Sequence, residues 1–287
     1  MGSLKGKVAI VTGASRGIGR GIAIALGKEG MTVYVTGRTA SKGSYHIKGT
    51  VGETAEDVTK AGGKGIAVQV DHSKDEQVEA LFDQVKREQG RLDILVNNAF
   101  QLSDDLLEVK PFWQKPLSNW EMVDVGVRSS YVAAWHAAKI MTPQKSGLIV
   151  KISGYVGVTY TYGVVFGMCK SAADRMSRDM AIELKPYNVG SVSLWQGLTF
   201  TERLEKNWEH DPSMKDKLVT NPAIGATVEF PGRVIAAMAK DDNMMRHSGG
   251  TFITAEMAQE YGVTDVDGKV IPSLRAERGS PIWKPIG

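Results

Sequence analysis

The chain contains 287 residues, of which 42% are hydrophobic and 23% are charged, and its formal net charge is +3. This length and composition are those of a globular protein that buries a full-sized core. The small net charge argues against a nucleic-acid partner, and no apolar run reaches the roughly 18 residues that a membrane-spanning helix needs.

The start of the chain and its single cysteine bear on where the protein works. The chain enters a predicted strand almost at once, without the apolar region that a secretory signal contains. Cys169 has no partner for an internal disulfide, which fits a reducing compartment. We therefore expect a cytoplasmic protein that has no membrane segment.

Short apolar runs alternate with helical patterns along most of the chain. Strands are predicted for the β-branched and apolar runs at residues 8–11, 32–36, 65–70, 92–96, 147–153 and 189–194. Helices are predicted where apolar residues recur at helical spacing, at residues 19–27, 53–61, 75–89, 120–142 and 164–184. This alternation predicts an α/β fold with a doubly wound, Rossmann-type parallel sheet covered on both faces by helices.

Irregular segments separate or follow these elements. Residues 39–50 are polar and are interpreted as a surface insertion before a helix. Residues 196–231 are less regular, and in this architecture they would cover the cleft at the carboxyl ends of the strands. Residues 264–287 form an irregular tail that contains several prolines. No repeat or linker divides the sequence, so we expect one domain over residues 1–287.

A glycine-rich turn joins the first predicted strand to the first predicted helix. Backbone N–H groups at a helix N-terminus and the helix dipole both favour an anion. Gly13 permits the tight turn, Gly17 lets the backbone approach a pyrophosphate, and Gly19 lets the helix pack on the sheet. The Gly-x3-Gly-x-Gly spacing between a strand and a helix predicts a dinucleotide site. The predicted contacts in this turn are Gly13, Ser15, Arg16, Gly17, Ile18 and Gly19.

The end of the second predicted strand bears on the choice of dinucleotide. A carboxylate there binds the ribose 2′-hydroxyl of NAD, whereas an arginine accommodates the 2′-phosphate of NADP. This strand is followed by Arg38 and no acid, and Arg16 lies in the glycine turn. Two guanidinium groups suit a phosphate dianion, so we expect NADP(H) rather than NAD(H). The alternative is that Arg38 is a solvated loop residue.

These motifs resemble those of the short-chain dehydrogenase/reductase family, and most of all its dehydrogenase/reductase member 1 branch. The resemblance covers residues 5–270, including Glu260–Gly268 late in the chain. It implies that Asp71 contacts the adenine, that Asn97 and Ala99 line the cofactor, and that Thr201 meets the carboxamide of the nicotinamide. Gly197 is assigned to the same site. The resemblance also implies a homodimer or homotetramer, assembled through the two long helices.

The same resemblance implies an active site built from asparagine, serine, tyrosine and lysine. Ser153 matches the serine that polarises the substrate oxygen, and Lys170 matches the lysine that holds the nicotinamide ribose. The tyrosine position is occupied by Phe166, and the asparagine position by Asp124. Because several positions differ together, we interpret the site as a divergent natural one rather than a single engineered knockout.

The phenylalanine has no proton to transfer, although a positioned acid or base contributes about 10²–10⁴ in rate. Tyr162 precedes Phe166 by four residues and would share its helix face if the helix begins early enough. Tyr160 lies on the preceding loop. We hypothesise that Tyr160 or Tyr162 supplies the missing hydroxyl; the alternative is that these rings only shape an apolar pocket.

Asp124 allows a different chemistry. A carboxylate beside Lys170 would stay ionised and could serve as a base. With Ser153, an Asp124–Lys170 pair could support a non-redox lyase or isomerase reaction, unless the pair is an inert ion pair. A third interpretation is a catalytically silent nucleotide-binding protein.

The substrate class is indicated by aromatic residues near the predicted site. An aromatic lining suits a small hydrophobic or aromatic carbonyl or alcohol. Our first interpretation is therefore an NADP(H)-dependent oxidoreductase with a non-standard proton donor. The histidines show no metal-ligand spacing, so no metal is expected. The aromatic residues are Phe100, Tyr155, Tyr160, Tyr162, Phe166, Trp195 and Phe200.

Overall fold

The computed structural model describes residues 2–43, 45–103, 105–210 and 224–287. The chain divides into two compact units, each assembled from three stretches. Unit 1 consists of residues 1–70, 196–242 and 253–273, and unit 2 of residues 71–195, 243–252 and 274–287. Together the strands form one seven-stranded, Rossmann-type parallel sheet, as the alternating pattern predicted. The expectation of a single domain stays a prediction.

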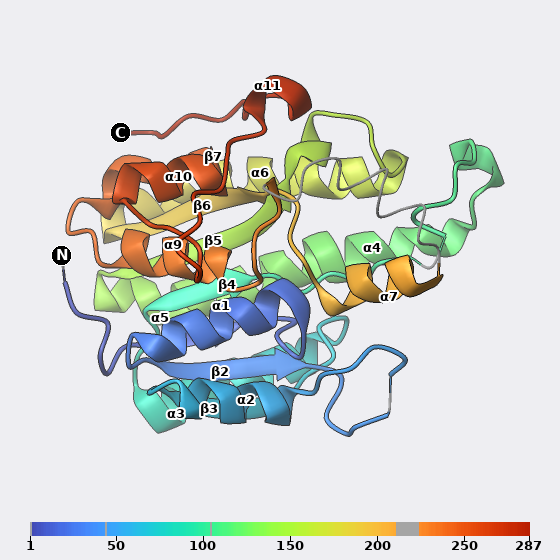
Figure 1. Cartoon of the computed structure of the whole chain (residues 1–287). Helices are drawn as coiled ribbons and strands as arrows, with labels where there is room; N and C mark the ends of the chain where they lie inside the picture. The colour runs from blue at the N-terminus through green and yellow to red at the C-terminus, as the bar shows by residue number, and fades with distance from the viewer. Residues whose placement is uncertain (1, 44, 104, 211–223) are drawn as a thin grey trace. The chain divides into compact units, whose positions relative to one another are not determined.

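Unit 1 contains three strands in the order β3-β2-β1, and both pairings are parallel. Figure 1 shows the blue helices α1 and α2 beside β2. The elements of this unit are β1 (Val8–Val11), α1 (Gly17–Lys28), β2 (Thr32–Gly37), α2 (Val51–Lys60), β3 (Lys64–Gln69), α7 (Glu202–His210), α9 (Phe230–Ala239) and α10 (Thr254–Tyr261).

Close packing fixes the position of α1 within unit 1. A Cβ atom on Gly21 would lie only 1.9 Å from the carbonyl oxygen of Val228, and one on Gly232 of α9 only 2.6 Å from Cβ of Ala25. Ile22 and Leu26 are fully buried on the same helix. Because backbone meets backbone here, glycine is required, and the N-terminus of α1 is held in place by its own packing.

Unit 2 carries the strands β4 to β7, in that order. Its strands and α-helices are α3 (Asp75–Gln89), β4 (Ile94–Asn97), α4 (Glu121–Val123), α5 (Ser129–Gln144), β5 (Gly147–Gly154), α6 (Val164–Leu184), β6 (Val189–Gln196), β7 (Thr251–Ile253) and α11 (Arg275–Arg278). Short 3-10 helices cover Phe112–Gln114, Leu117–Trp120, Tyr155–Gly157, Lys185–Tyr187 and Met244–His247.

The long helix predicted at residues 120–142 is confirmed as a continuous helical run over residues 121–144, but it is not α-helical throughout. A π-helical turn at Asp124–Arg128 separates α4 from α5. The hydroxyls of Ser129 and Ser130 donate to the carbonyls of Val125 and Gly126 inside this turn. These bonds compete with the regular backbone ladder and widen it locally. The prediction also missed β7, α9 and α10, whereas the bounds predicted for α3 and α6 are confirmed.

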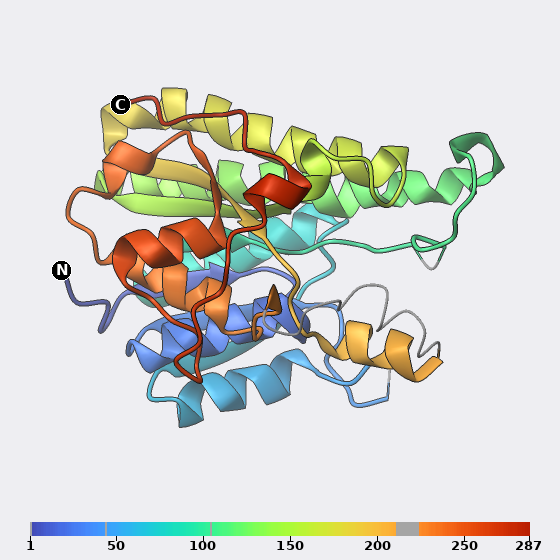
Figure 2. The same ribbon diagram turned by 45° about the horizontal axis from the view of Figure 1, so that its top comes forward.

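The C-terminal tail is largely irregular, as expected, but it is anchored to unit 2. In Figure 2 the dark red end of the chain runs along the yellow helix α6. Arg178 of α6 donates to the carbonyl of Lys284, and the N–H of Thr251 in β7 donates to the carbonyl of Trp283 at 2.9 Å. Among the helices that the structure describes, none combines the length and the apolar character needed to cross a membrane.

Candidate functional site

The glycine turn of unit 1 has the backbone geometry of an anion-binding turn. Gly13 has φ of 63° and Gly17 has φ of 57°, both in the left-handed region where a side chain is strained. Gly17 is the first residue of α1, so its N–H is one of the donors that the helix leaves unpaired. The turn therefore presents a backbone donor at the positive end of the helix dipole.

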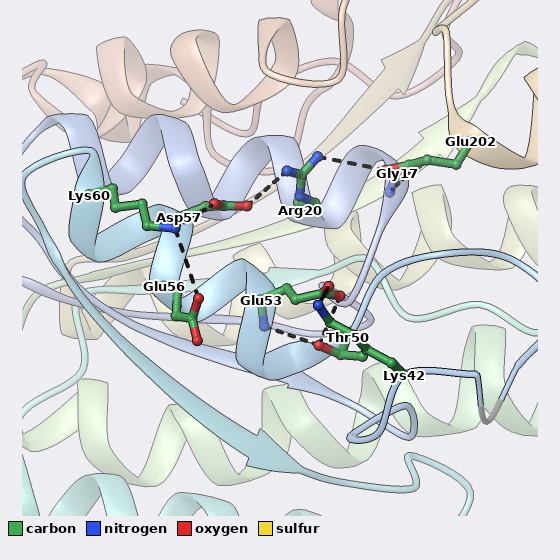
Figure 3. Close-up of polar contacts among 9 residues, drawn as sticks. All are labelled: Gly17, Arg20, Lys42, Thr50, Glu53, Glu56, Asp57, Lys60 and Glu202. Carbon is green, nitrogen blue, oxygen red and sulfur yellow. Dashed lines mark hydrogen bonds and ion pairs between the residues drawn. The ribbon is translucent and has the colours of Figure 1, made fainter.

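A carboxylate from α7 occupies this donor. The N–H of Gly17 donates to Oε2 of Glu202 at 2.8 Å. The other carboxylate oxygen, Oε1, lies 3.8 Å from Nη1 of Arg20, whose Nη2 donates to Asp57 at 2.8 Å. Figure 3 shows this chain of charges running from Glu202 along α1 to α2. The anion preference of the turn is therefore satisfied by the protein's own side chain.

The predicted surface insertion folds over Arg16. The guanidinium of Arg16 donates to the carbonyls of Lys48 at 3.0 Å and Gly49 at 2.7 Å, and it lies 4.8 Å from the centre of the Tyr45 ring. Burial lowers the pKa of this guanidinium below its ordinary value. Arg38, by contrast, is exposed after β2. Arg16 thus holds the insertion, while Arg38 is the solvent-facing arginine beside the turn.

The other predicted cofactor residues of unit 1 differ in their surroundings. Ser15 is buried, while Gly197 is exposed beyond β6. Thr201 precedes α7 and accepts a hydrogen bond from the N–H of Leu204, as a helix-capping residue does. A Cβ atom on Gly17 would lie 3.6 Å from Cγ2 of Thr201, so these two predicted residues are neighbours. Ile18 and Gly19 form the first turn of α1.

Unit 2 holds the predicted cofactor residues that follow β3 and β4. Oδ1 of Asp71 accepts bonds from the N–H and the hydroxyl of Ser73, which shapes the turn before α3. Asn97 is buried at the end of β4, and its Nδ2 donates to the carbonyl of Ser130 at 3.2 Å. Oδ1 of Asn97 has no partner within the described residues, which leaves an acceptor for a bound group. Ala99 is also buried.

Phe166 occupies an apolar cluster of unit 2. Its side chain is 9% exposed and packs with Met122 and Cys169. The ring of Phe100 meets it edge to face at 5.3 Å between centroids, and the ring of Tyr162 does so at 5.6 Å. Such edge-to-face pairs are favourable. The tyrosine position of the resemblance is thus filled by a phenylalanine that two other aromatic rings surround.

Lys170 lies one helical turn after Phe166 and packs against the same rings. Its Nζ is 4.6 Å from the centre of the Phe100 ring and 5.6 Å from that of Phe166, and it donates to the carbonyl of Ile152 at 3.3 Å. Burial lowers the pKa of Lys170 to about 8, and the charge of Asp174 opposes that shift. Aromatic faces attract the ammonium group, so the rings of Phe100 and Phe166 are partners of the cation.

The hydroxyl of Ser153 bonds to α6. It donates to the carbonyl of Lys170 at 3.3 Å and also bonds to the carboxyl group of Asp174. That carboxyl group accepts bonds from Ser193 at 2.6 Å and from the indole N–H of Trp195 at 2.8 Å. Burial raises the pKa of Asp174 despite these donors. The sequence interpretation missed Asp174, although its position four residues after Lys170 was a usable signal.

Lys151 is a second residue that the sequence interpretation missed. It lies on β5 and is 3% exposed, and its Nζ donates to the carbonyl of Gly126 at 3.0 Å and to the hydroxyl of Ser130 at 2.6 Å. Burial lowers its pKa well below the ordinary value, and the nearby charge of Lys170 adds to that shift. The available signal was a lysine inside an otherwise apolar strand.

The structure separates several residues that were expected to act together. Asp124 is exposed on the π turn, and the expected Asp124–Lys170 ion pair is not formed between these two described residues. Tyr160 is 77% exposed, away from the packed rings. Trp195 is fully buried against Tyr155, so both belong to the core and not to an open pocket. Polarity explains this separation, because Asp124 and Tyr160 keep access to water.

The aromatic set therefore reduces to Phe100, Tyr162 and Phe166 in unit 2, while Phe200 packs against Trp208 in unit 1. The reduced set, together with Lys170, gives a cation on an apolar surface. Within the described residues, no group of His, Cys, Asp or Glu side chains is arranged to hold a metal ion. The thiol of Cys169 has its pKa raised by burial to about 11, which makes it a poor nucleophile.

Known proteins share both sequence and fold with this chain. The family model for short chain dehydrogenases matches residues 7–212. Dehydrogenase/reductase SDR family member 1 of Mus musculus is 39% identical over 93% of this chain and 86% of its own length. A 1-cyclohexenylcarbonyl-CoA reductase of Streptomyces collinus is 32% identical over 97% of this chain and 93% of its own.

Solved structures with a similar fold are also described as dehydrogenases. A short-chain type dehydrogenase/reductase from Mycobacterium marinum has a TM-score of 0.73 and 25% identity, covering 88% of this chain and 94% of that chain. A protein from Beutenbergia cavernae, described as an NAD(P)-dependent gluconate 5-dehydrogenase, has a TM-score of 0.75 and 26% identity over 88% and 96% of the two chains. That structure contains NADP at low occupancy.

Proposed function

Because this chain belongs to the short-chain dehydrogenase/reductase family and is an oxidoreductase of that type, we propose that it uses NADP(H) with a hydrophobic or aromatic carbonyl or alcohol. The aromatic surface formed by Phe100, Tyr162 and Phe166 supports the substrate class. The Streptomyces relative, named for 1-cyclohexenylcarbonyl-CoA, is consistent with a cyclic apolar substrate.

The residues present fit a dinucleotide. In unit 1, the left-handed glycines place the backbone N–H of Gly17 at the start of α1, where a diphosphate would replace the carboxylate of Glu202, and Arg38 offers a cation to a 2′-phosphate. In unit 2, Lys170 and the unpaired Oδ1 of Asn97 would hold the nicotinamide ribose. A bound nicotinamide supplies or accepts the hydride. The NADP found in the Beutenbergia structure supports the phosphorylated form.

The proton of this reaction is assigned to the hydroxyl of Tyr162. The observation that supports this assignment is the contact between the Tyr162 and Phe166 rings, whose centroids are 5.6 Å apart. The Nζ atom of Lys170 lies 5.6 Å from the centre of the same Phe166 ring. Helix α6 begins at Val164, so Tyr162 precedes the helix, yet it still reaches the Phe166 ring. Lys170, whose pKa of about 8 is near the working range, would exchange the proton with that hydroxyl. Ser153 would orient the substrate oxygen.

The test compares Tyr162→Phe with Tyr160→Phe. We expect Tyr162→Phe to lower the rate of NADPH consumption with aromatic ketones by about 10²–10⁴, because it removes a positioned acid. Tyr160→Phe removes a hydroxyl from an exposed ring and should leave the rate unchanged. Full turnover in both variants would contradict the tyrosine assignment. A wild type that binds NADPH without any turnover would instead favour a silent nucleotide-binding protein.

The non-redox alternative loses its support, because it required a pair between Asp124 and Lys170 that is not formed.

Homo-oligomeric assembly remains part of the proposal. Tyr131 and Trp135 of α5 and Ile182 of α6 are about half exposed, which supports contacts through these helices. A dimer or tetramer in light scattering would agree. A cytoplasmic location fits the single, unpaired cysteine.

A further inference from the structure

Two anions can accept a hydrogen bond from the N–H of Gly17 in unit 1: the carboxylate of Glu202 and the diphosphate of a dinucleotide. The N–H of Gly17 donates to Glu202 at 2.8 Å. Under the proposed function, on which this step rests, the same N–H faces the diphosphate of a dinucleotide. A single N–H makes one well-aligned bond, and two anions at one helix end repel each other. The carboxylate of Glu202 and the diphosphate therefore exclude each other at this donor.

The ion pair with Glu202 is the weaker of the two that Arg20 makes. Arg20 lies 3.8 Å from Glu202 but donates to Asp57 at 2.8 Å, so its guanidinium keeps its stronger partner if Glu202 leaves. Glu202 is also the first residue of α7. A carboxylate in a first helical turn is favoured by the dipole of its own helix. Departure from Gly17 thus gives up the hydrogen bond and part of the attraction between Glu202 and the guanidinium of Arg16.

Other contacts anchor α7 while Glu202 changes partner. Arg203 donates to the hydroxyl of Tyr45 at 2.9 Å, and Lys206 donates to the carbonyl of His46 at 2.7 Å. Both bonds join α7 to the insertion that Arg16 holds over the turn. With these anchors in place, rotation of the Glu202 side chain is sufficient to free the N–H of Gly17.

We propose that Glu202 is an internal competitor for the dinucleotide site, and that it sets the affinity for the cofactor by occupying the N–H of Gly17. The carboxylate stabilises the turn when it is bound there and must be displaced by the diphosphate. Removing the competitor consequently strengthens nucleotide binding, although Glu202 itself makes no contact with the nucleotide.

The experiment measures NADPH and NADH binding by titration calorimetry with the full-length protein. Glu202→Gln removes the charge, and Glu202→Asp keeps the charge but shortens its reach by one methylene. We expect both to bind NADPH more tightly, by about three- to tenfold for Glu202→Gln. Glu205→Gln is the matched control, because Glu205 is exposed on the same helix and should bind as the wild type does.

A second readout is thermal unfolding of the protein without nucleotide. Loss of the contact should lower the midpoint of Glu202→Gln by about 1–2 °C and leave that of Glu205→Gln unchanged. Equal affinities in wild type and Glu202→Gln would overturn the competitor role and leave the proposed function standing. An equal gain in Glu205→Gln would also overturn it, in favour of a general charge effect. If neither the wild type nor any variant binds NADPH or NADH, both proposals fall.

Discussion

Lys170 is held between two opposing influences on its charge. Burial disfavours the ammonium group, whereas the faces of Phe100 and Phe166 and the carboxyl of Asp174 favour it. The outcome is a pKa of about 8, well below the ordinary 10.5. In the folded protein this lysine therefore loses its proton at a lower pH than it does in the unfolded chain.

This difference predicts how stability depends on pH. Between pH 8 and 10.5 the unfolded chain keeps a proton on Lys170 that the folded protein releases, so stability rises with pH. Relative to Lys170→Met, the wild type should gain about 1–3 kcal/mol of unfolding free energy between about pH 7 and pH 10. Urea unfolding at several pH values measures it. Lys185→Met, at an exposed lysine, is the control and should show no such trend.

At the scale of residues, the sequence predicted which side chains are present but not always which of them meet. The replacement of a tyrosine by Phe166 was visible, because Ser153 and Lys170 fix the spacing. The contact between Phe100 and Phe166 was not, because it joins separate elements of the fold. Asp124 was paired with Lys170 on likeness alone, and the π turn directs it to solvent.

At the scale of elements, the π turn between α4 and α5 packs against Phe100 of the aromatic cluster. Gly126 lies in that turn, and a Cβ atom there would meet Cε2 of Phe100 at 2.4 Å. Lys151 of β5 donates to the carbonyl of the same glycine. The turn, the strand and the aromatic ring are therefore mutually adjusted around one residue without a side chain.

We expect Gly126→Ala to displace Phe100 and to lower the free energy of unfolding by about 1–3 kcal/mol. Gly52→Ala is the control, because a Cβ atom there meets only Oγ1 of Thr50, at 3.8 Å. Alanine at that helical position should be neutral or mildly stabilising. Denaturant unfolding compares the two. Equal stability of the two variants would contradict the tight contact between Gly126 and Phe100.

Element prediction succeeded where periodicity alone decides the structure. Helices α3 and α6 have clear apolar spacing, and their bounds were predicted correctly. The π turn was missed because it is stabilised by hydrogen bonds from Ser130 and Lys151 to the carbonyl of Gly126. The spacing of hydrophobic residues does not reveal such bonds. Strand β7 was missed because it spans only Thr251–Ile253, too short for a pattern.

At the scale of the whole molecule, each unit is completed by segments that are distant in the chain. Unit 2 includes the C-terminal residues, where the N–H of Ile286 donates to the carbonyl of Ser248 at 2.9 Å. The guanidinium of Arg175 lies 5.4 Å from the centre of the Trp283 ring. The composition of residues 264–287 predicted an irregular tail, but not that its end is bonded to β7 and α6.

Deletion of residues 282–287 should therefore destabilise the protein by about 2 kcal/mol, because it removes one backbone bond to Thr251 of β7, another to Ser248 and a cation–π contact. Thermal unfolding would show a lower midpoint. Removal of Gly287 alone is the control and should have no effect, since the residue is exposed. An unchanged midpoint in the longer deletion would mean that the tail lies on unit 2 without stabilising it.

The interleaving of the two units constrains how the chain acquires its structure during synthesis. Helix α1 is made early, yet the surface that receives Gly21 is formed by residues around Val228. The apolar face of α1 therefore cannot be fully buried until most of the polypeptide has left the ribosome. Nascent chains of this protein should consequently depend on holding chaperones for longer than chains whose early helices pack against their immediate neighbours.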